Sequence, residues 1–135
     1  MINTGVFDYI NVLEKAADGA WRRNEVIANN IANIDTPDYK RQDISFQAEL
    51  QHALKASKYT SLDTKIRELN DRNKLSHIEP RQYTDYANYS YRLDGNNVDV
   101  DNENVELASN QIVYQAVVQS INSEFADIKT AIGKG

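Results

Sequence analysis

Residues 28–40 read Ala-Asn-Asn-Ile-Ala-Asn-Ile-Asp-Thr-Pro-Asp-Tyr-Lys, and they join the end of an apolar-periodic helix to a proline-marked turn. The asparagines Asn29, Asn30 and Asn33 lie together at this helix exit. Their amides can satisfy helix-end carbonyls or bond a neighbouring subunit. A simple helix stop explains one asparagine and the proline, but it does not explain three asparagines.

The turn itself is marked by the residues that follow. Pro37 disfavours the α conformation at Thr36, so we expect the helix to end before the proline. Tyr39 and Lys40 then start the chain in a new direction. If φ is positive at Asp38, an aspartate adopts that conformation at some cost.

A stripe of apolar or small side chains precedes the turn, with alternating steps of four and three residues. This a/d pattern is typical of a helix that packs along its length on a partner helix. It predicts a helix over residues 6–34, about 43 Å long at 1.5 Å per residue. The polar member, Asn24, can set the register of helix pairing at a cost in stability. The stripe consists of Val6, Ile10, Leu13, Ala17, Ala20, Asn24, Ile27, Ile31 and Ile34.

A second stripe with the same spacing predicts a C-terminal helix over residues 104–132. Its members are Leu107, Gln111, Tyr114, Val118, Ile121, Phe125, Ile128 and Ile132. Two long helices with one stripe each can bury those stripes on each other. An antiparallel pair would place Asn24 opposite the turn that carries Gln111 and Gln115. The expected fold is therefore mainly α, with the terminal helices packed as an antiparallel coiled coil in one domain, residues 1–135.

The middle segment, residues 35–103, is expected to be irregular. Short helical turns are indicated around residues 44–58 and 62–69. Alternation at residues 89–93 and again at 98–100 predicts a short β-hairpin near residues 89–100. Its turn would be formed by Asp94, Gly95, Asn96 and Asn97.

Charge and length narrow the function classes. The chain has 135 residues, one domain's worth, and a formal net charge of -5. Residues 1–39 hold three basic and six acidic side chains. Residues 40–92 hold ten basic and seven acidic side chains, and residues 93–135 hold two basic and seven acidic ones. No concentrated basic face is evident, which argues against a nucleic-acid partner. No stretch is long and apolar enough to predict a membrane span.

Signals for catalysis or a metal site are weak. The chain has no cysteine, and His52 and His77 lack the spacing of a metal site. A calcium loop that starts at Asp99 would need glycine and glutamate where Asn104 and Asn110 stand. An acidic first turn of a helix explains this stretch better. We expect no catalytic residue, no cofactor and no metal.

Residues 28–40 resemble the N-terminal signature of bacterial flagellar rod and hook proteins, and that signature ends in Thr-Pro-Gly-Tyr-Lys. In this chain Asp38 replaces the usual glycine. Residues 94–103 are similar to the motif that precedes the last helix in proximal-rod members of the family. The matching signature residues are Asn29, Asn30, Ala32, Asn33, Thr36, Pro37, Tyr39 and Lys40.

The resemblance implies a structural, non-enzymatic subunit of the proximal rod in the flagellar basal body, within the cell envelope. Such subunits polymerise through their terminal helices around the export channel, and their signature residues contact neighbouring subunits. The implied partners are further copies, other rod proteins, the adaptor FliE and the flagellar export gate. Type III export without a cleaved signal agrees with residues 1–5, which lack a basic and apolar leader.

Two other classes of function stay open. The first is a coiled-coil binding module, such as a secreted effector or an export chaperone, that uses the same stripes on a foreign partner. The second is an enzyme that acts through the polar middle segment. Polymerisation, as opposed to a complex of fixed stoichiometry, distinguishes the rod subunit from the binding module.

Overall fold

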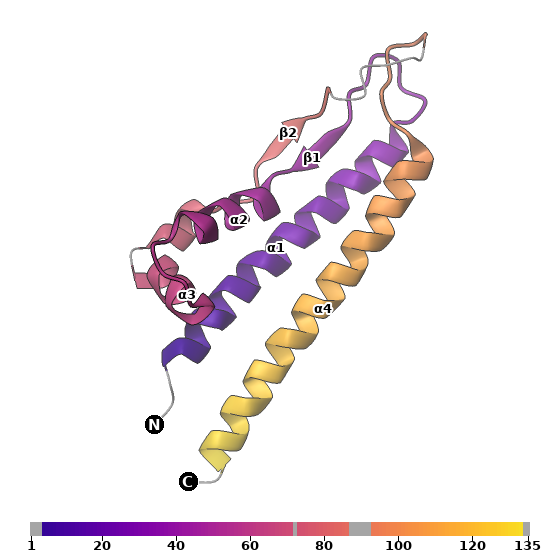
Figure 1. Cartoon of the computed structure of the whole chain (residues 1–135). Coiled ribbons are helices and arrows are strands. Elements are labelled where there is room, and N and C mark those ends of the chain that lie inside the picture. Colours follow the sequence, from indigo (N-terminus) through magenta and orange to yellow (C-terminus); the bar gives the residue numbers. More distant parts are fainter. Residues whose placement is uncertain (1–3, 72, 87–92, 134–135) are drawn as a thin grey trace.

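Two long antiparallel helices dominate the computed structural model, which describes residues 4–71, 73–86 and 93–133 (Figure 1). Helix α1 spans Thr4–Ala32 and helix α4 spans Val100–Gly133. The prediction of a mainly α fold is confirmed. Helix α1 begins two residues before the expected start at 6 and ends two residues before the expected end at 34. Helix α4 begins four residues before the expected start at 104.

The start of α4 follows from its acidic sequence. The Asp99 carboxylate accepts hydrogen bonds from the backbone N–H groups of Asp101 (3.0 Å) and Asn102 (3.3 Å). It thereby satisfies two of the N–H groups that the first helical turn leaves without a partner. Asp101 and Glu103 add negative charge in that turn, where the helix dipole favours it.

The middle segment packs on the other side of α1 from α4 (Figure 1). It contains helices α2 (Phe46–Ala56) and α3 (Leu62–Asp71) and a 3-10 helix, η1 (Lys74–His77). Strands β1 (Gln42–Ile44) and β2 (Gln82–Thr84) pair antiparallel, with Asp43 opposite Tyr83. The main apolar core lies here, and it consists of Val26, Ile44, Phe46, Leu69, Leu75 and Ile78.

A close approach between α1 and α2 explains a glycine inside a helix. A Cβ atom at Gly19 would lie 2.7 Å from ring atoms of Phe46, which is closer than real Cβ contacts. The absence of a side chain at Gly19 therefore lets the buried Phe46 ring lie against the α1 backbone.

The seam between α1 and α4 is less apolar than expected. Ile10, Ala20 and Ile27 are buried on α1, whereas the buried side chains of α4 are the polar Glu103 and Asn110. The Asn110 amide donates to the backbone carbonyl of Ala20 at 2.8 Å. The α4 stripe is half-buried at Leu107, Tyr114, Val118, Ile121 and Ile128, and it is exposed at Gln111, Phe125 and Ile132. Coiled-coil packing along the full helix pair stays a prediction.

The polar members of the two stripes do lie together. Asn24, Gln111 and Gln115 line one pocket, together with Trp21 and Tyr114. The rings of Trp21 and Tyr114 are 6.0 Å apart at an angle of 49°. The Asn24 side-chain oxygen is buried there without a hydrogen-bond partner among the described residues.

The hairpin prediction is wrong at its second strand. The described strands pair residues 42–44 with residues 82–84, and the expected first strand falls partly on residues 87–92, which lie outside the described part of the chain. Val98 and Asp99 are irregular and Val100 begins α4. The reason is local bonding, since the Val98 N–H donates to the Asn96 side chain at 2.8 Å and Asp99 caps the helix. The alternation of buried Val98 with exposed Asp99 reflects a packed loop.

No described helix has the length and apolar character needed to cross a membrane.

Candidate functional site

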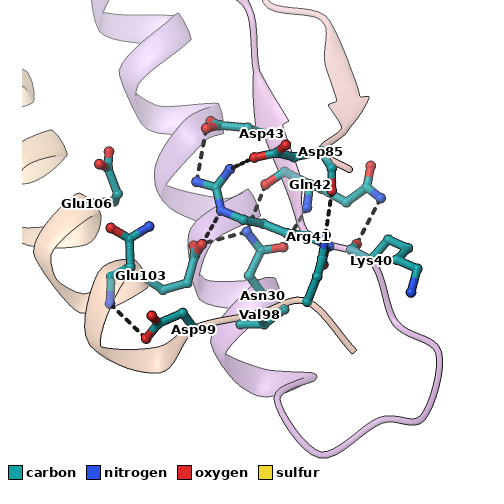
Figure 2. Close-up of polar contacts among 12 residues, drawn as sticks. Asn30, Lys40, Arg41, Gln42, Asp43, Asp85, Val98, Asp99, Glu103 and Glu106 are labelled. Carbon is teal, nitrogen blue, oxygen red and sulfur yellow. Dashed lines mark hydrogen bonds and ion pairs between the residues drawn. The ribbon is translucent and has the colours of Figure 1, made fainter. Parts of the chain in front are cut away.

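A cluster of buried polar side chains joins the end of α1, strand β1 and the start of α4 (Figure 2). We call this cluster the polar corner. Buried polar groups are costly unless they are hydrogen-bonded, so their partners show what the cluster does. Its members, each 7% exposed or less, are Asn30, Arg41, Asp43, Asn96, Asn97 and Glu103.

Asn30 is the central residue of the corner and is fully buried. Its amide nitrogen donates to the Gln42 carbonyl at 2.8 Å and to the Glu103 carboxylate at 3.1 Å. Its oxygen accepts from the Tyr39 hydroxyl and from the Gln42 backbone N–H, both at 3.0 Å. These four bonds use both donors and both lone pairs of the amide. One side chain thus joins α1, the turn, β1 and α4.

The other signature asparagines are bonded differently. The Asn33 amide donates to the Asn29 carbonyl at 2.8 Å, and the Thr36 hydroxyl donates to Asn33 at 3.0 Å. These bonds stay within the helix end, where the Asn29 carbonyl also accepts the backbone N–H of Asn33 at 3.1 Å. The exposed members of the signature are Asn29, Ala32, Thr36 and Pro37.

Asn96 holds the second loop on the end of α1. Its amide nitrogen lies within hydrogen-bonding distance of the carbonyls of Asn33 (2.8 Å), Ile34 (3.1 Å) and Thr36 (2.9 Å), so its two N–H groups are shared among three acceptors. These carbonyls belong to the turn directly after α1, where the regular donors of the helix run out. Asn96 therefore completes the end of a helix more than sixty residues away in sequence.

The turn after α1 and the loop before α4 cross at close range. Asp38 has a φ of 60°, in the left-handed region, and its N–H donates to the Asp94 carbonyl at 2.7 Å. Gly95 has a φ of 77°, and a Cβ atom there would lie 2.4 Å from an Asp38 carboxylate oxygen. The Lys40 ammonium donates to the Gly95 carbonyl. Glycine is favoured at position 95 by its φ, and a larger residue there would displace the Asp38 carboxylate.

Asn97 joins the same loop to both sides of the small sheet. Its side-chain oxygen accepts from the Arg41 backbone N–H at 2.6 Å. Its amide nitrogen donates to the Asp85 carbonyl, also at 2.6 Å. The predicted turn residues Asn96 and Asn97 are thus buried connectors between the two ends of the chain.

Charged side chains complete the corner. The Arg41 guanidinium donates to Glu103, to Asp85 at 2.9 Å and to Asp43 at 3.1 Å (Figure 2). The Arg41 side chain is 7% exposed and the Glu103 side chain is fully buried. Burial is the largest single influence and would lower the pKa of Arg41, but the hydrogen bonds and negative charges of Glu103 and Asp43 together outweigh burial and raise that pKa. Arg41 is therefore a permanent cation enclosed by three carboxylates.

A second arginine extends this network along α1. The Arg23 guanidinium pairs with Asp43 at 2.9 Å and with Glu106 at 2.6 Å. Burial raises the pKa of the Asp43 carboxyl, but the bonds from Arg23 and the Ile44 N–H outweigh it and hold that pKa below its usual value. The charges thus alternate from Glu106 through Arg23, Asp43 and Arg41 to Glu103.

This arrangement connects segments; it does not present a reactive group. The side-chain atoms of Asn30 and the guanidinium of Arg41 are occupied by internal partners. Among residues 4–71, 73–86 and 93–133, no group of three or more His, Cys, Asp or Glu side chains is placed to hold a metal ion. His52 and His77 are exposed. The contacts of the polar corner hold the two terminal helices together.

The sequence singled out Asn30 in the signature and, separately, Asn96 and Asn97 in an expected turn, but it did not single out the charged residues of the corner. A usable signal was present in the C-terminal helix. Glu103, Glu106 and Asn110 stand at i, i+3 and i+7, so they share one helix face. A polar face at the start of a packing helix indicates buried partners, here Arg41 for Glu103 and Arg23 for Glu106.

Comparisons with known proteins identify the family of this chain. The model of a family described as "Flagella basal body rod protein" matches residues 10–40, which include most of α1 and the signature. "Flagellar basal body rod protein FlgB" of Bacillus subtilis (strain 168) is 40% identical over 126 residues, covering 93% of this chain and 94% of that protein. The protein of that name in Borrelia hermsii is 33% identical over 135 residues (91% and 99%). That of Escherichia coli (strain K12) is 31% identical over 121 residues (84% and 85%).

Proposed function

Since this chain belongs to the flagellar basal body rod proteins, we propose that it is a subunit of the proximal rod and polymerises through α1 and α4 around the export channel. As a member of the family it is a structural protein of the bacterial flagellum and assembles with other rod components. The finer assignment rests on the surface of α4 and on the exposed part of the signature.

The observation that carries the proposal is the apolar surface of α4. Val105 is 66% exposed, Ile112 68%, Phe125 50% and Ile132 64%. These side chains lie on more than one face of the helix, and α1 covers one face. A helix that is apolar on several sides requires more than one neighbour. We infer that neighbouring subunits supply the missing contacts and complete the coiled-coil seam with α1.

The polar corner supplies fixed geometry for such an assembly. Because its buried bonds set the angle between α1 and α4, every subunit presents the same pair of helices. The exposed signature residues Asn29, Thr36 and Pro37 lie at this end of the molecule, where they can contact the next subunit. At the base of the rod, the proposed partners are FliE and the export gate.

The test is made in the bacterium that encodes this chain. Deletion of the gene should abolish motility, and an epitope-tagged copy should restore motility and be present in purified basal bodies. A tagged chain found in a complex of fixed stoichiometry with one foreign partner, and absent from basal bodies, would contradict the rod proposal. That result would favour the coiled-coil binding module.

A further inference from the structure

A groove of about 600 Å³ lies on α1 between α2 and α4. Figure 1 shows α2 and α4 on the two sides of α1. Small residues line the α1 side of the groove, where the Phe46 ring of α2 lies over Gly19. This side consists of Ala16, Gly19 and Ala20, and the walls include Phe46 and Leu50 from α2 and Asn110 and Val113 from α4.

The groove offers little net charge to an occupant. Its charged lining residues are Arg23, Asp43 and Glu106, and Arg23 pairs with both carboxylates at one end. The remaining lining residues are apolar side chains, a tyrosine, a serine and neutral amides. Burying an unpaired charge against such a surface is unfavourable, so the groove selects an uncharged partner.

An uncharged helix of this kind is present on the chain itself. Residues 107–123 contain no Asp, Glu, Lys or Arg, although 26% of the whole chain is charged. Depletion of charge is typical of the buried core of a protein interface. On one exposed face, apolar and small side chains recur at the i, i+3 and i+7 spacing of a helix that binds in a groove. These residues are Val105, Ala108, Ile112, Ala116 and the neutral Gln119.

The groove and this face cannot meet within one chain. Asn110 and Val113 of α4 form a wall of the groove, so the same helix cannot also fill it. The exposed face of α4 can reach a groove only on another copy. Such a contact joins two different surfaces, and repeated contacts of this type build an open chain of subunits.

We propose that the groove between α1, α2 and α4 binds the uncharged segment of α4, centred on Ile112, from a second copy of this chain. The inference rests on the proposed function, because it names a contact through which rod subunits polymerise. It assigns two complementary surfaces to each subunit, and each can be blocked separately.

The test uses the purified full-length chain in sedimentation velocity over a range of concentrations. Ala48→Arg places a charge on the exposed α2 rim of the groove, and Ile112→Asp places one on the α4 face. We expect each variant to weaken self-association about tenfold or more, because an unpaired charge would be desolvated. Ala56→Arg makes the same change on α2 outside the groove and should associate as wild type does. Circular dichroism checks that each variant is folded.

Mixing the two blocked variants gives the decisive result. Ile112→Asp keeps an intact groove and Ala48→Arg keeps an intact α4 face, so the mixture should form 1:1 dimers and no longer species. Dimers in the mixture, with monomers in each variant alone, would support the proposal. Wild-type association in both variants, a mixture that stays monomeric, or a wild-type chain that never associates would overturn it. Presence in basal bodies is a separate readout, so the rod assignment can survive the loss of this contact.

Discussion

The two sides of α1 are built on different physical principles. Towards α2, α3 and η1, the helix packs in an apolar core that includes Val26, Phe46 and Leu69. Towards α4, the deepest contacts are polar, made by Glu103 and Asn110, and much of the α4 stripe stays half-buried or exposed. The apolar side stabilises the folded chain through the area it buries, whereas the polar side sets orientation.

This difference indicates a division between folding and assembly. Apolar burial contributes in proportion to area and tolerates small shifts. Buried ion pairs add little net stability compared with apolar packing, but they are very sensitive to the loss of one partner. A subunit whose α4 is fixed by such bonds at one end can leave the remainder of that helix for neighbouring copies.

Loss of a buried carboxylate should produce the largest effect. Glu103→Ala removes the partner of Arg41 and of the Asn30 amide, leaving both buried. Because Arg41 retains Asp43 and Asp85, we expect unfolding free energy to fall by about 3 kcal/mol, near the low end for a broken buried pair. Urea unfolding followed by circular dichroism measures the change.

Glu106→Ala is the matched control on the same helix. Glu106 also pairs with an arginine, but its side chain is 34% exposed, so water can replace the lost partner. Its removal should cost less than about 1 kcal/mol. Equal losses in the two variants would show that burial of Glu103 is not what makes the corner sensitive.

A substitution at Gly19 should disrupt the packing of α1 on the apolar core. Alanine normally stabilises a helix relative to glycine by about 1 kcal/mol. At this position its methyl group would meet the buried Phe46 ring at 2.7 Å, so we expect Gly19→Ala to destabilise by about 1–3 kcal/mol. Thermal unfolding of this variant is compared with that of Gly133→Ala, where a Cβ atom meets nothing within 4 Å. A stabilised Gly19→Ala chain would contradict the close packing of α1 on α2.

Low pH should destabilise the folded chain on the polar side of α1 through protonation of Asp43. Its pKa is held below the usual value in the folded chain, chiefly by Arg23 against the opposing effect of burial. The folded state therefore binds this proton less tightly than the unfolded state, whose Asp pKa is about 3.9. The stabilising effect is present above that pH and is lost as pH falls through the folded pKa. Urea midpoints from pH 7 to pH 3 should decrease less in Asp43→Asn than in wild type, and equal decreases would contradict this role.

The features that depend on local sequence pattern, the two long helices and the turn after the first one, could be predicted from the sequence. The a/d stripes located both long helices, because a period near 3.5 residues requires a helix with one packed side. The signature located the turn, because Pro37 and the asparagines punctuate the backbone in a characteristic way. The signature also located Asn30, whereas Asn96 and Asn97 were expected only as residues of a hairpin turn; all three are buried in the polar corner.

The remaining parts depend on distant contacts. Strand β1 pairs with β2, which lies about forty residues further along the chain. Because no short hairpin turn joins the two strands, the local sequence does not predict this pairing. Residues 98–100 alternate like a strand, but Asn96 and Asp99 bond the backbone in other ways. The partners of Arg41 come from β1, the segment after β2 and α4, so their convergence follows from the fold and not from spacing in the sequence.

The smallest expected effect concerns the turn that links the two sides of α1. Asp38 has a φ of 60°, which costs an L-residue about 1–2 kcal/mol and costs glycine almost nothing. Glycine loses part of this gain because its unfolded chain is more flexible. Asp38→Gly should therefore stabilise the chain by about 0.5–1 kcal/mol, as measured by urea unfolding.

Asn73→Gly is the matched comparison, because Asn73 has a φ of 52° and lies on the apolar side of α1, just before η1. Asparagine adopts the left-handed region readily, so its replacement should change stability less. If Asp38→Gly destabilised the chain, the Asp38 carboxylate would have to contribute more at the crossing with Gly95 than its backbone strain costs. The polar side of α1 would then extend into the turn itself, and the glycine usual at this position of the rod signature would not suit this chain.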